Sequence, residues 1–163
     1  MCIRDRSDDS VDGSDPDPDG NGEEGTDESG TTNTTLTEAP DMGIAKRVVT
    51  SNLSEDGCTE IVYEFNIENL GNVEISDIQV EDDLLSAGFG SCGSFTTSVT
   101  SDEFTVDPAY DGMGNNNLLV GDDNIVPGDV GAILLTVEAC GCPSGTMIMN
   151  LSLIHISEPT RPY

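Results

Sequence analysis

Glu60-Ile-Val-Tyr-Glu-Phe-Asn-Ile-Glu68 places apolar side chains at alternate positions over most of its length. Successive side chains of a β-strand point to opposite faces of the sheet, so this period predicts a strand with one buried and one exposed face. One face carries Ile61, Tyr63, Phe65 and Ile67, and the other carries Glu60, Glu64, Asn66 and Glu68. The turn residues Asn69-Leu-Gly-Asn72 are predicted to end this strand.

Similar short runs, separated by turn residues, lie on both sides of this strand. In the run Val73–Val80 the apolar positions change parity near Ser76 and Asp77, which predicts a β-bulge. The other candidate strands are Ile44–Thr50, Ser94–Ser101, Phe104–Asp107, Asn117–Val120 and Ala132–Ala139, the last with Ile133, Leu135 and Val137 inward. No long helix is predicted. Residues 41–150 therefore predict an all-β, immunoglobulin-like β-sandwich of about seven strands.

Residues 7–40 have a different composition. They contain eleven acidic residues and no basic one, and their only apolar residues are Val11, Leu36 and Ala39. Such a segment buries too little apolar surface to offset the entropy lost on ordering. We predict a disordered acidic linker before the sandwich.

The two ends of the chain resemble translated sequencing adapter. Met1-Cys-Ile-Arg-Asp-Arg6 resembles the mosaic end of transposase-based libraries, and Leu151–Arg161 resembles its reverse complement running into the adapter. We interpret residues 1–6 and 151–163 as artefact, and residues 7–150 as a fragment of a longer reading frame whose last native strand is truncated. The apolar residues of Leu151–Ile156 are nevertheless able to mimic a strand on the sheet edge that this truncation leaves open, and we interpret such pairing as coincidence.

Charge and composition exclude several functions. The formal net charge is −27, and Lys46 and Arg47 are the only basic residues between the adapter-like ends, so we expect no nucleic-acid binding and no attraction to an anionic membrane. No run is long and apolar enough to insert into a bilayer. The one histidine, His155, lies in the adapter-like end, so a serine or cysteine nucleophile has no neighbouring histidine base, and we expect no enzyme activity.

The cysteines between the ends number four: Cys58, Cys92, Cys140 and Cys142. An even number in a strand-rich chain is typical of disulfides formed in an oxidising compartment, and three connectivities are open. In an extended strand Cys140 and Cys142 lie near the upper limit of disulfide reach, so we expect each to pair with either Cys58 or Cys92. Free or mixed thiols and a four-thiolate zinc site are the alternatives.

Three groups of oxygen ligands are candidate calcium sites. Asp15, Asp17, Asp19 and Asn21 alternate around a glycine, as calcium loops require, but the glutamate that would complete an EF-hand loop is replaced by Thr26. Asp82-Asp83 follows a candidate strand and Asp122-Asp123 lies in a loop. Each pair alone supplies too few ligands, so the two pairs would have to meet in space. The alternative is that all three groups are solvated acids.

One family resemblance covers nearly all of residues 41–139. Asn69-Leu-Gly-Asn-Val73 followed by Val80-Glu-Asp-Asp-Leu84 resembles the bacterial surface repeat catalogued as domain of unknown function eleven. The resemblance implies an immunoglobulin-like fold, tandem copies in secreted or wall-attached proteins, and no known catalysis. We therefore expect an extracellular or cell-surface spacer or stalk unit whose partners are neighbouring repeats. The alternative is an adhesion or ligand-binding module with calcium-bound acidic loops.

Overall fold

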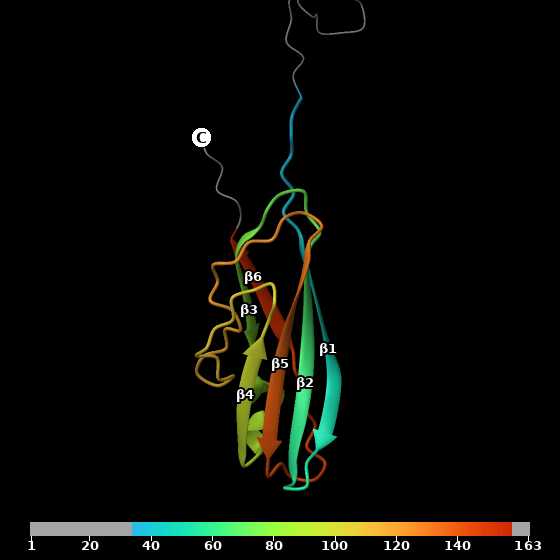
Figure 1. Cartoon of the computed structure of the whole chain (residues 1–163), viewed down its shortest axis with the longest axis vertical. Coiled ribbons are helices and arrows are strands. Elements are labelled where there is room, and N and C mark those ends of the chain that lie inside the picture. Colours follow the sequence, from blue (N-terminus) through green and yellow to red (C-terminus); the bar gives the residue numbers. More distant parts are fainter. Residues whose placement is uncertain (1–33, 158–163) are drawn as a thin grey trace, which may run out of the picture. The chain divides into compact units, whose positions relative to one another are not determined.

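The computed structural model describes residues 34–157 (Figure 1). The chain divides into two units, residues 1–37 and 38–163, and every element described lies in the second unit. The elements are β1 (Met42–Leu53), β2 (Cys58–Asn69), β3 (Ser76–Asp82), α1 (Leu84–Ala87), the 3-10 turn η1 (Phe89–Ser91), β4 (Ser94–Thr100), β5 (Val130–Cys140) and β6 (Ser152–Ser157). Most of the predicted linker, residues 7–33, lies outside the described residues.

Two antiparallel sheets form the fold. Within residues 34–157 one sheet has the strand order β1-β2-β5-β4, and the other pairs β3 with β6. Figure 1 shows the four strands of the larger sheet side by side, with β3 and β6 on one side of them. The predicted all-β sandwich is therefore confirmed.

Six strands form within residues 34–157, and two further segments that were predicted as strands do not. Phe104–Asp107 and Asn117–Val120 form isolated bridges rather than strands, through Val106 opposite Leu119 and Glu81 opposite Asn117. The segment between β4 and β5 contains many Asp, Asn and Gly residues, whose side chains and backbone favour turns over continuous ladders. Its apolar residues still reach the core, because Leu118 and Leu119 are fully buried.

The core lies between the inward faces of the sheets. On β2 the inward residues Tyr63, Phe65 and Ile67 are buried, as the alternation predicts. On the neighbouring strand β5, Ile133, Leu135 and Val137 are fully buried on the same face of the sheet, and they were also predicted to point inward. From the smaller sheet and the loops come Ile75, Ile78, Val80, Leu84, Phe89, Leu118 and Leu119. Burial of these apolar side chains makes the largest favourable contribution to the free energy of folding.

The predicted bulge is present at the start of β3. The pairing register with β6 shifts between Ser76 and Gln79, and Asp77 adopts a positive φ of 55°. The extra residue places Ile78 and Val80 on the buried face, although they differ in parity from Val73 and Ile75. A second register shift, between Val48 and Thr50 of β1, was not predicted.

The adapter-like end pairs with the smaller sheet. Strand β6 lies antiparallel to β3, with Ile154 opposite Val80 and Leu153 opposite Glu81. Ile154 and Ile156 are partly buried against the core. The expected pairing of these residues with a sheet edge is therefore present, and we interpret it as coincidence because residues 151–163 resemble adapter.

We predict that Gly131→Ala destabilises the fold. A Cβ at Gly131 would lie 2.3 Å from Cε2 of the buried Phe104 ring, and overpacking of this kind costs about 1–3 kcal/mol. Urea unfolding followed by circular dichroism measures the change in the free energy of unfolding. Gly114→Ala is the matched control, because the nearest atom to its Cβ, Oδ2 of Asp111, is 3.7 Å away. Equal midpoints for the two variants would contradict this packing.

Candidate functional site

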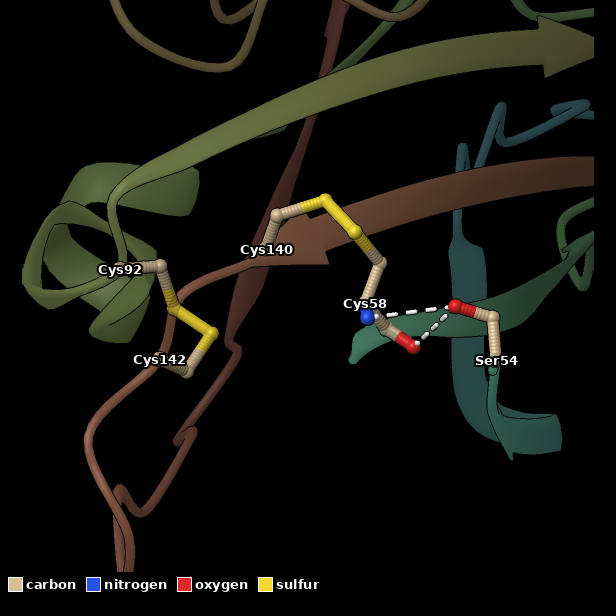
Figure 2. Close-up of a disulfide and its surroundings, with 5 residues drawn as sticks. All are labelled: Ser54, Cys58, Cys92, Cys140 and Cys142. Atoms are coloured by element: carbon tan, nitrogen blue, oxygen red, sulfur yellow. Dashed lines mark hydrogen bonds between the residues drawn. A yellow bond between two sulfur atoms is a disulfide. The ribbon is translucent and has the colours of Figure 1, made fainter. Parts of the chain in front are cut away.

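The four cysteines form two disulfides at one end of the larger sheet. Cys58 pairs with Cys140, and Cys92 pairs with Cys142, so neighbouring cysteines have separate partners as expected (Figure 2). This arrangement contradicts both the free-thiol and the zinc alternatives.

The first disulfide joins two strands of the larger sheet. Cys58 is the first residue of β2 and lies directly opposite Cys140, the last residue of β5. The turn before β2 is closed by Ser54, whose hydroxyl donates to the Cys58 carbonyl at 3.0 Å and accepts from the Cys58 N–H at 3.2 Å. The end of the β2–β5 ladder is therefore held covalently, and the turn beside it by hydrogen bonds.

The second disulfide fixes the segment that leads into β4. Cys92 caps the 3-10 turn η1, two residues before β4 begins, and Cys142 follows the end of β5. Because Ser94 pairs with Cys140, this bridge holds the start of β4 beside the end of β5. Three adjacent strands, β2, β5 and β4, are thus cross-linked at the same end.

The predicted calcium ligands are not gathered into one site. Asp15, Asp17, Asp19 and Asn21 lie outside the described residues. Within residues 34–157, no three carboxylate, histidine or cysteine side chains lie close enough together to hold a metal ion. The structure therefore does not bring the two acidic pairs together as a joint site would require.

Three of the four loop acids have partners within the protein. Asp82 is fully buried and forms an ion pair with Lys46. Asp83 caps α1 by accepting from the Ser86 N–H and hydroxyl, which lowers its pKa. Asp123 accepts from the backbone N–H of Thr105 at 2.8 Å and from its hydroxyl at 3.0 Å. Asp122 is exposed.

A single carboxylate organises the loop at residues 111–115. Oδ1 of Asp111 accepts from the backbone N–H groups of Met113, Gly114 and Asn115, at 2.8, 2.8 and 2.9 Å. These hydrogen bonds hold the pKa of Asp111 below its ordinary value of 3.8. Because the folded pKa is depressed, the stabilisation is present above pH 3.8 and is lost as pH falls through the folded pKa.

We predict that Asp111→Asn makes the fold less sensitive to acid between pH 4 and pH 2. The amide oxygen keeps acceptor geometry but does not titrate, so its contribution stays constant as pH falls. Melting temperature followed across this range measures the effect, with the exposed Asp122→Asn as control. A parent chain and an Asp111→Asn chain that lose stability in parallel would contradict the assignment.

A buried polar centre lies between β1, β2 and β3. Nζ of Lys46, on β1, donates to Oδ2 of Asp82, on β3, and stands 4.6 Å from the centroid of the Tyr63 ring and 4.8 Å from that of Phe65. The side chain of Lys46 is 14% exposed. Burial lowers the pKa of Lys46, while the charge of Asp82 and the hydrogen bond to it oppose the decrease.

Residues near the end of the chain complete this centre. Nδ2 of Asn150 donates to Oδ2 of Asp82 at 3.2 Å, and the Ser152 hydroxyl donates to the same oxygen at 2.8 Å. The buried Tyr110 hydroxyl donates to the Asp82 carbonyl at 3.1 Å. Burial, followed by the Asp82 charge, raises the pKa of Tyr110 well above its ordinary value. The centre therefore joins β1, β3 and the segment after β5.

Sequence analysis did not identify this centre. Asp82 was expected to be either a calcium ligand or a solvated acid, and Lys46 and Asn150 were given no role. A signal was present, because Asp82 shares the parity of Ile78 and Val80, which face the core. A carboxylate at an inward position requires a buried partner.

Comparisons with known proteins do not assign the chain to a family: no family model, curated protein or solved structure matches it. Within residues 34–157, no helix has the length and apolar character needed to cross a membrane.

Proposed function

We propose that this chain contains a non-catalytic spacer module of a bacterial secreted or cell-surface protein. The observation that carries the proposal is the pair of disulfides, which cross-links β2, β5 and β4 at one end of the larger sheet. Disulfides persist in oxidising compartments, which supports an extracellular location. A module cross-linked in this way resists extension and proteolysis, as a spacer requires.

The acidic segment before the sandwich supports the same proposal. Its composition is that of a charged linker, and charged linkers extend through self-repulsion. The polar loops of the described part form turns through internal hydrogen bonds, as at Asp111 and Asp123. The partners expected for such a module are neighbouring repeats of the same polypeptide.

Sequencing of the genomic region that encodes the chain tests the proposal. We expect tandem near-copies that keep the positions equivalent to Cys58, Cys92, Cys140 and Cys142. Limited proteolysis with and without reductant adds a physical test, since the oxidised module should survive and the reduced one should be cleaved. A single copy joined to a catalytic domain, or equal cleavage rates in both redox states, would contradict the spacer function.

A further inference from the structure

The buried polar centre contains the only lysine of the chain. The protein has 32 acidic residues, yet the partly buried Lys46 lies against the fully buried Asp82 and two aromatic rings. A buried ion pair between a lysine and a carboxylate offers little net stability compared with apolar residues of similar size. The placement of Lys46 therefore calls for another explanation.

Asn150 stands beside this amine. Nζ of Lys46 and Nδ2 of Asn150 both donate to Oδ2 of Asp82, so the amine and the carboxamide meet at one carboxylate oxygen. The second oxygen of the carboxylate, Oδ1 of Asp82, is buried and has no hydrogen-bond partner. The same holds for the carboxamide oxygen, Oδ1 of Asn150. The amine of Lys46 and the carboxamide of Asn150 thus both contact the carboxylate of Asp82, one oxygen of which has no hydrogen-bond partner.

We propose that Lys46 and Asn150 become joined by an intramolecular amide bond, with Asp82 transferring the protons. Nζ of Lys46 attacks Cγ of Asn150, the bond from Cγ to Nδ2 breaks, and the nitrogen leaves as ammonia. Asp82 accepts one proton from the attacking amine and delivers one to the departing nitrogen. One carboxamide is exchanged for another, so no oxidant or reductant is needed.

The surroundings favour this reaction. Burial lowers the pKa of Lys46, which favours the neutral amine that acts as nucleophile. Transfer of one proton across the hydrogen bond gives a neutral amine and a neutral Asp82 acid. A half-turn of the Asn150 amide exchanges its oxygen and nitrogen, so that the acid can donate to the carboxamide oxygen and polarise it. The rings of Tyr63 and Phe65 lie beside the amine and reduce its contact with water.

The bond would link β1 to the segment that precedes β6. Residues 46–150 would form a closed loop that contains both disulfides. Tension applied outside this loop would pass from Lys46 to Asn150 without reaching β2, β4 or β5. The bond would form by the same chemistry whether or not the module serves as a spacer, so its test is independent of the proposed function.

Intact mass of the purified full chain, measured under reducing and denaturing conditions, tests the proposal. We expect a mass about 17 Da below that of the reduced sequence, the mass of one ammonia molecule. Peptide mapping should recover a branched peptide that contains Lys46 and Asn150. Labelling of the unfolded chain with an amine-reactive reagent should modify the N-terminus alone, because the only lysine is consumed.

Variants separate this bond from its alternatives. Lys46→Arg keeps the positive charge and Asn150→Ala removes the carboxamide, so both should show the full mass. Asp82→Ala should also show the full mass or form the bond many times more slowly. Arg47→Gln, which removes the neighbouring exposed cation, should behave as the parent chain. A parent chain of full mass with a reactive Lys46 would overturn the proposal. A loss of about 18 Da would also overturn it, because that mass indicates condensation of Lys46 with a carboxylate such as Asp82. The peptide map of the parent chain shows whether Lys46 and Asn150 are joined, so the test does not depend on the folding of any variant.

Discussion

Reduction of both disulfides is expected to lower the free energy of unfolding by about 4 kcal/mol for each bridge taken alone. The bridges join residues 82 and 50 positions apart, and each restricts the unfolded chain by closing a long loop. Most small domains are stable by only about 5–15 kcal/mol, so the reduced protein should be largely unfolded at 37 °C. Urea unfolding in oxidised and reduced samples, followed by circular dichroism, measures the effect.

The disulfide experiment is best made with the Asn150→Ala variant, in which the proposed amide bond cannot form. The paired variants Cys58→Ser with Cys140→Ser and Cys92→Ser with Cys142→Ser then separate the two bridges. The first pair should cost slightly more, because its loop is longer. Coincident curves for oxidised and reduced protein would show that the bridges do not constrain the fold.

Phe65→Ala is expected to lower the free energy of unfolding by about 3–5 kcal/mol. The ring is fully buried on β2, it packs in the core, and its removal leaves a cavity between the sheets. It also removes one of the two rings beside Nζ of Lys46. The readout is the urea midpoint in the oxidised state.

Val48→Ala is the control for this core substitution. Val48 lies on β1 with 55% of its surface exposed, so its truncation should change stability by about 0.5 kcal/mol or less. A similar loss for both variants would mean that Phe65 does not occupy the interior of the fold.

Regular alternation made the central strands predictable. Phe65 on β2 and Leu135 on β5 lie at positions of constant parity, and burial of one face fixes the register of such strands. The change of parity before Ile78 likewise predicted the bulge at Asp77. The segment between β4 and β5 was less predictable, because the side chain of Asp111 binds its own backbone and replaces a ladder with turns.

The cysteine pairing was predictable only in part. The separation of Cys140 and Cys142 indicated that they have different partners, but the choice between Cys58 and Cys92 depends on the register between β2 and β5. That register places Cys58 opposite Cys140 and leaves Cys92 for Cys142. Pairing across strands is a tertiary property that spacing alone does not determine.

The buried polar centre depends on residues far apart in sequence. Lys46 and Asp82 are 36 residues apart, and Asn150 lies a further 68 beyond Asp82. The parity of Asp82 indicates an inward position, but no local pattern identifies its partners. Only the tertiary fold, in which Lys46 of β1 reaches Asp82 of β3 and the chain returns after β5, brings these groups together.

Single-molecule extension of the oxidised protein tests the cross-linked spacer most directly. With handles at residues 38 and 157, full unfolding of a chain without cross-links would release about 400 Å, whereas the Cys58–Cys140 bridge alone limits the extension to about 130 Å. The proposed amide bond would shorten it further. We predict an extension of at most about 130 Å for the oxidised protein. An extension near 400 Å in the oxidised protein would contradict the account.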